Sequence, residues 1–185
     1  MKIAGPALGL LEIESIARGV VVVDALVKRA AVEVAIAEAV TPGKYLIVFS
    51  GPVAEVEESL GAAVATGGAL VLDRLLLPQV AEAVRLGLTG TLARVGPRDA
   101  VGIVETHTVA SAILAADTAV KRSKVKLTQL HLAKGIGGKG YFLVAGEQHD
   151  VEAALEGAAA AIEPTLLVAT EIISRPHADL PGRVV

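Results

Sequence analysis

The sequence has no cysteine and no tryptophan, and it has only two tyrosines and two phenylalanines among its 185 residues. Without cysteine the chain can form no disulfide, thiolate metal site or cysteine nucleophile, which suits a cytoplasmic protein. Nucleic-acid binding usually needs a basic surface and aromatic rings that stack on bases. With few such rings and a net charge of −3, we expect no nucleic-acid partner.

Long apolar runs are also missing. The longest stretch without a charged residue covers residues 59–72 and contains two adjacent glycines, whereas a membrane-spanning helix needs about 20 apolar residues. We therefore expect no membrane partner. The apolar fraction is nevertheless 53%, supplied mostly by alanine, valine and leucine. This is enough for packed cores and for contacts between subunits.

The most informative feature of the sequence is an internal repeat. Residues 7–32 align with residues 100–125 at an offset of 93, with nine identities in 26 positions. After a two-residue insertion in the second copy, further identities continue through Gly43/Gly138 and Lys44/Lys139. The chain is a tandem duplication, and we predict two domains, 5–92 and 98–185, each of roughly 90 residues.

Each copy predicts the same order of elements. Ser15 or Thr108 is placed to cap the first helix by accepting a hydrogen bond from a free backbone N–H group. The second helix begins near Pro52 or His149. The strands are expected at 8–12, 32–36, 45–49 and 69–77 in the first copy, and at 101–105, 125–127, 141–145 and 166–173 in the second. This β-α-β-β-α-β order is the ferredoxin-like split βαβ arrangement, an α+β fold.

Apolar side chains at helical spacing predict the buried face of each first helix. Extra helix-like sequence at 79–86 precedes the join between the copies. The residues expected on the buried faces are Ile16, Val20, Val23 and Val27 in the first copy, and Val109, Ile113, Ala116 and Val120 in the second.

Motifs for catalysis or cofactor binding are weak. The glycine-rich segment 135–139 lacks the Gly-Lys-Ser/Thr ending of a phosphate-binding loop. The four histidines have no metal-ligand spacing. The repeated carboxylates Glu12/Glu105 and Asp24/Asp117 are explained as well by inherited architecture as by chemistry. We expect no enzymatic activity, no cofactor and no metal.

Several segments together resemble the bacterial microcompartment shell family. Residues 7–32 and 100–125 resemble the first strand, helix and second strand of its domain. Residues 135–155 are similar to its pore loop, third strand and second helix, and residues 173–177 to the end of its last strand. The resemblance covers nearly the whole chain, in both copies and in the family's order.

The resemblance implies a quaternary structure. Tandem-domain members form rings of three chains that imitate the hexamer of single-domain members, so we expect a homotrimer with pseudohexameric symmetry. Closed cyclic assembly also suits repeated interfaces. The resemblance places one set of residues at the contacts between neighbouring rings: Lys28, Arg29, Lys121, Arg122 and Arg175. The first copy has Leu76–Pro78 where the second has the arginine.

The resemblance also places two turns at the ring axis. Glycines there allow several backbone segments to approach one another closely. Some propanediol-type relatives carry a cysteine before Pro-Gly-Lys in the first turn, and three such residues hold an iron–sulfur cluster. Thr41 occupies that position here, so we predict no cluster and a pore ringed by hydroxyl groups. The predicted pore residues are Thr41, Pro42, Gly43, Lys44, Gly135, Ile136, Gly137 and Gly138.

The sequence thus favours a structural protein of a microcompartment shell in the cytoplasm. Its expected partners are other shell proteins and small polar metabolites that pass through the pore. A second hypothesis remains: tandem ferredoxin-like domains also occur as regulatory modules that bind small molecules.

Overall fold

A computed structural model of the chain describes residues 3–96, 99–177 and 180. The chain divides into two compact units. The first unit comprises residues 1–80 and 133–138, and the second comprises residues 81–132 and 139–185. A short segment of the second repeat, 133–138, therefore belongs to the first unit.

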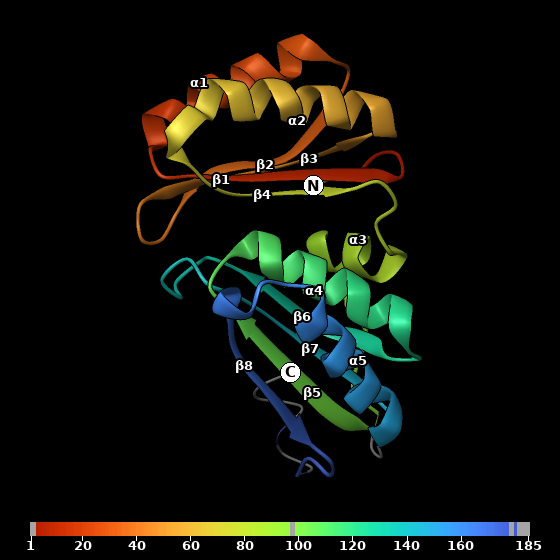
Figure 1. Ribbon diagram of the computed structural model, residues 1–185. Helices are drawn as coiled ribbons and strands as arrows, with labels where there is room; N and C mark the ends of the chain where they lie inside the picture. The colour runs from red at the N-terminus through yellow and green to blue at the C-terminus, as the bar shows by residue number, and fades with distance from the viewer. Residues whose placement is uncertain (1–2, 97–98, 178–179, 181–185) are drawn as a thin grey trace. The chain divides into compact units, whose positions relative to one another are not determined.

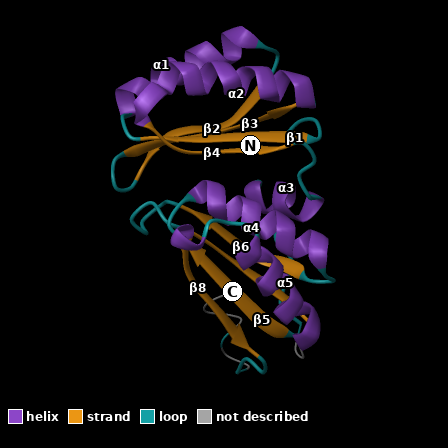
Figure 2. Cartoon of the chain, in the orientation of Figure 1, coloured by secondary structure: helices purple, strands orange, loops and turns teal. Residues whose placement is uncertain are grey.

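The first unit contains a four-stranded antiparallel sheet in the order β2-β3-β1-β4. Helices α1 and α2 pack against each other and lie on one face of this sheet (Figures 1 and 2). Its elements are β1 (Ala7–Ile13), α1 (Ile16–Arg29), β2 (Glu33–Val40), β3 (Lys44–Gly51), α2 (Val53–Gly67), the 3₁₀ turn η1 (Gly68–Leu70) and β4 (Val71–Leu77).

The second unit repeats this arrangement, with the sheet order β6-β7-β5-β8. It also contains α3, which follows β4 in the chain and packs against α4 and β6. Its elements are α3 (Glu82–Leu88), β5 (Ala100–Thr106), α4 (Val109–Arg122), β6 (Lys126–Leu132), β7 (Gly140–Gly146), α5 (Gln148–Ala160), the 3₁₀ turn η2 (Pro164–Leu166) and β8 (Leu167–Ile173).

Both sheets have the strand order of the ferredoxin-like fold, which confirms the predicted fold class. Each first helix crosses from one strand to a parallel strand with a third strand between them, as a split βαβ unit requires. The helix extension expected at 79–86 is present as α3, slightly displaced.

The predicted caps of the first helices are also confirmed. The Ser15 hydroxyl accepts a hydrogen bond from the Arg18 N–H at 3.2 Å. The Thr108 hydroxyl accepts one from the Ser111 N–H at the same distance. Each cap satisfies one of the donors that the first helical turn leaves without a partner in the helix.

Each first helix approaches its sheet through a contact that needs a small residue. In the first unit Gly19 faces Tyr45, and a Cβ atom at Gly19 would lie only 2.4 Å from the ring atom Cγ. In the second unit Gly140 faces Ala112, and its Cβ would lie 2.5 Å from the alanine methyl. Each copy therefore has a glycine at this contact, which lies on the helix in the first unit and on the sheet in the second.

The face predicted to be buried on α1 is wrong. Ile16, Val20 and Val27 are 43%, 56% and 45% exposed. Val23 alone of the predicted set packs against the core, and it is only partly buried. The residues that α1 buries lie on the neighbouring face: Gly19, Val22 and Leu26.

The corresponding prediction for α4 is largely right, since Val109, Ile113 and Ala116 are fully buried. The difference between the copies has a physical reason. Both helices turn the same side to their sheets, since Ala112, Ala115 and Ala119, the counterparts of Gly19, Val22 and Leu26, are also buried, but α4 additionally packs against α3.

Candidate functional site

The two turns predicted to lie at a pore are in contact with each other within the first unit. The backbone of Gly138 approaches the first turn so closely that a Cβ atom there would lie 2.9 Å from the Thr41 carbonyl oxygen and 3.0 Å from Pro42 Cδ. Gly138 has φ 81°, in the left-handed region that favours glycine. A larger residue at this position would therefore separate the turns.

Two lysines attach segment 133–138 to the first unit. The ammonium group of Lys44 donates a hydrogen bond of 2.8 Å to the Gly138 carbonyl. The ammonium group of Lys134 lies 2.9 Å from a Glu38 carboxylate oxygen. No feature of the sequence indicated the Lys134–Glu38 contact, because it joins residues that have no counterpart pair in the repeat.

Lys44 has a second role, since its ammonium group also forms an ion pair with Glu12. The Glu12 side chain is fully buried and that of Lys44 is 10% exposed. Of the predicted pore residues in this turn, Thr41, Pro42 and Gly43 are exposed in the single chain, whereas Lys44 is buried. The buried Lys44 side chain therefore stabilises the turns from the core side.

The second copy repeats this ion pair between Lys139 and Glu105, with a distance of 2.7 Å and side chains 40% and 35% exposed. Both residues of each pair are identical between the copies. This explains the repeated glutamates as partners of the repeated lysines. The signal was present in the sequence, because both members of the pair recur together.

Four of the five residues predicted to contact neighbouring rings lie at the ends of α1 and α4. Lys28 forms an exposed ion pair with Asp24 at 2.6 Å. Lys121 pairs in the same way with Asp117, whose side chain is only 5% exposed. Basic residues at these helix ends also interact favourably with the helix dipole.

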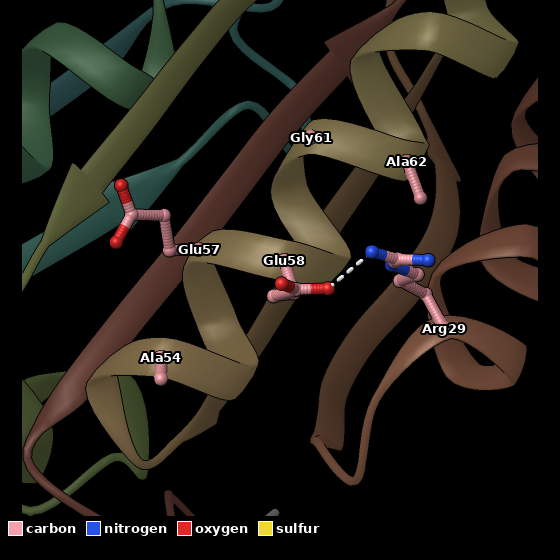
Figure 3. A pocket seen from close by; sticks show the side chains of 6 residues that line it. All are labelled: Arg29, Ala54, Glu57, Glu58, Gly61 and Ala62. Carbon is pink, nitrogen blue, oxygen red and sulfur yellow. Dashed lines mark ion pairs between the residues drawn. The ribbon is translucent and has the colours of Figure 1, made fainter.

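The arginines that follow these lysines form ion pairs with the second helix of each repeat copy. Arg29 pairs with Glu58 on α2, and Arg122 lies 3.1 Å from Glu156 on α5. The Arg29–Glu58 pair lies at a shallow depression of about 590 Å³ between α1 and α2 (Figure 3). The depression is lined by Arg29, Ala54, Glu57, Glu58, Gly61 and Ala62.

Arg175, the remaining predicted contact residue, is exposed just after β8. Within the described ranges, no three histidine or acidic side chains converge as metal ligands would. The helices of the described residues are all too short or too polar to span a bilayer.

The fold and the repeated turns define a known class of protein. The sequence matches the BMC domain family twice, over residues 7–80 and 100–176, and the chain belongs to this family.

Among individual proteins, the chain is 42% identical to the bacterial microcompartment shell protein PduT of Citrobacter freundii over 180 residues, which is 97% of each chain. A crystal structure of a microcompartment protein from Desulfitobacterium hafniense is similar, with a TM-score of 0.84 and 36% identity over 94% of this chain and 97% of that one. The fused permuted hexameric shell protein of the RMM microcompartment shares the fold, with a TM-score of 0.63 and 22% identity over 83% and 79% of the two chains.

Proposed function

We propose that this protein is a structural component of a bacterial microcompartment shell, without catalytic activity. The observation that carries the proposal is the presence of two BMC domains in a chain that is 42% identical, over nearly its full length, to a shell protein. The compartment places the protein in the cytoplasm, where it assembles with other shell proteins.

Three copies of the chain form the tile, because two domains per chain then supply six domains around one axis. In this trimer Thr41, Pro42, Gly43, Lys44, Gly135, Ile136, Gly137 and Gly138 surround the axis. The contact between the two turns supports this role, because turns from neighbouring domains must meet wherever several domains share an axis. Small polar metabolites pass through the opening.

Lys28, Arg29, Lys121, Arg122 and Arg175 lie at the edges of the tile and contact neighbouring tiles. Individual edge contacts are weak, but a facet repeats them many times, so their effects accumulate. The exposure of the Lys28 side chain, at 72%, leaves it accessible to a neighbouring tile while it pairs with Asp24.

The experiment is sizing by light scattering combined with electron microscopy of the purified protein. We expect a particle with three times the 18.8 kDa mass of the chain, and sheets at high concentration or with shell partners. A protein that stays monomeric and forms no sheets under either condition would contradict the proposal. The regulatory-module hypothesis predicts instead a thermal shift with one ligand and no rings.

A further inference from the structure

The two first helices of the repeat differ sharply in how much of their surface is covered. Half of the large apolar side chains that are exposed among the described residues lie on α1: Ile16, Val20, Val21 and Val27. Ile16, Val20 and Val27 form one stripe, because their spacing of four and seven residues returns to the same side of a helix. In α4 the counterparts of the first two, Val109 and Ile113, are fully buried.

The structure shows what packs on α4. Helix α3 contacts α4, and it is the segment that follows the last strand of the first copy. A hydrogen bond fixes the start of α3: the backbone N–H of Ala81 donates to Asp117 Oδ1 at 2.7 Å. The Val84 side chain of α3 is fully buried.

Helix α1 carries the same carboxylate in the same place. Asp24 aligns with Asp117 in the repeat, yet its side chain is 58% exposed whereas that of Asp117 is 5% exposed. The elements with which α1 packs extensively are α2, β1, β2 and β3. The first unit therefore has the stripe and the aspartate, while the segment that packs on α4 and bonds the counterpart aspartate follows the last strand of a copy.

The last strand of the second copy is also followed by such a segment. The pairing of β1 with β4 and of β5 with β8 aligns Leu77 with Ile173. Continuing this alignment places His177 at the position of Ala81, and the apolar Leu180 at the position of Val84.

We propose that the α1 stripe binds the segment that follows β8 in a second copy of this chain. Asp24 accepts a hydrogen bond from the backbone of that segment, and Leu180 packs on Val20. In a closed ring the segment after each domain covers the next domain, so the segment after the second domain must reach another chain. The proposal rests on the proposed trimer and names the contact that closes it.

The first test is the variant Val20→Glu, with Val53→Glu on α2 as the control. Both valines are exposed in the single chain, at 56% and 37%, so both variants should fold with an unchanged circular dichroism spectrum. We expect Val20→Glu to raise the dissociation constant of the trimer by about thirtyfold or more, as loss of a central apolar contact does. Val53→Glu should leave it unchanged.

The second test compares Asp24→Ala with Asp117→Ala. Asp117→Ala should destabilise each chain, because it removes the acceptor for Ala81 N–H within the chain. Asp24→Ala should leave the thermal stability of the dissociated chain unchanged and weaken the trimer by about tenfold. Equal effects on the isolated chain would overturn the assignment of Asp24.

The third test uses the absence of native cysteine. In the double variant Val20→Cys, Leu180→Cys, a short bifunctional maleimide should link different chains into dimers and trimers. The variant Val53→Cys, Leu180→Cys should not be linked. If the unmodified protein is monomeric, the proposed function fails. If it is trimeric but Val20→Glu stays trimeric and no cross-link forms, only the α1 contact is refuted.

Discussion

Glu12 and Lys44 form a buried ion pair, while their duplicates Glu105 and Lys139 form a pair that is more than a third exposed. The same two residues thus occur in two environments within one chain. Lys44 of the first pair also donates a hydrogen bond to the Gly138 carbonyl. This pair therefore connects a strand of the first unit to both turns. The duplication supplies a matched comparison of buried and exposed electrostatics.

We expect Glu12→Gln to lower the free energy of unfolding by about 3 kcal/mol or more, because it leaves the Lys44 charge buried without its carboxylate. Glu105→Gln should cost less than about 1 kcal/mol, since solvent screens an exposed pair. Urea denaturation at one protein concentration measures both. Equal losses in the two variants would show that burial of the first pair has no energetic consequence.

The caps of the first helices give a second prediction. Ser15→Ala and Thr108→Ala should each lower the free energy of unfolding by about 1 kcal/mol, because each removes an acceptor for a backbone N–H group. Thr66→Ala is the control, since the Thr66 hydroxyl bonds the Ala62 carbonyl inside a helix that is already hydrogen-bonded. Thermal unfolding followed by circular dichroism should show little change for this variant. A loss as large as those of the cap variants would contradict the capping argument.

Two helical glycines should respond in opposite directions to alanine. Gly19→Ala should destabilise the protein by roughly 1–3 kcal/mol, because the new methyl overlaps Tyr45 close to its backbone, where the ring cannot swing away. Gly61→Ala in α2 meets no atom within 4 Å and should stabilise the protein by about 0.5–1 kcal/mol. Denaturant midpoints measure both variants. A stabilised Gly19→Ala protein would show that α1 does not need its close approach to the sheet.

The edge assignment predicts separate effects on tiling and on trimer formation. Replacing both Lys28 and Lys121 by Asp should abolish the sheets seen by electron microscopy, compared at a protein concentration at which light scattering shows the variant to be trimeric. The physical reason is that the change reverses the charge at two edges that repeat across a facet. Replacing both residues by Arg keeps the charge and should retain sheets. Sheets that persist in the Asp variant would refute the edge role of these lysines.

Much of the fold was predictable because its signals are local. Ser15 and Thr108 are recognised as caps from the residues beside them, and the strands follow from short apolar runs between turns. Each of these signals occurs in both copies of the repeat, which supported the predicted order of elements. The pore and edge roles remain predictions, because they depend on contacts between chains.

The buried face of α1 was not predictable. Two apolar stripes run along this helix, one through Ile16, Val20 and Val27, and one through Val22 and Leu26. The first stripe is equally regular, and periodicity carries no information about which stripe meets the sheet. That choice depends on Gly19 and Tyr45, which are far apart in the sequence and meet only when the chain has folded.

The sequence by itself determined the duplication, the order of strands and helices and the caps, because each depends on residues close together in the chain or on identity between the copies. Only the tertiary structure decided which stripe of α1 is covered, which of the two repeated lysine–glutamate pairs is buried, and that Asp117 holds the start of α3. These outcomes depend on distances between segments that are distant in sequence, and such distances are set by how the helices pack on their sheets.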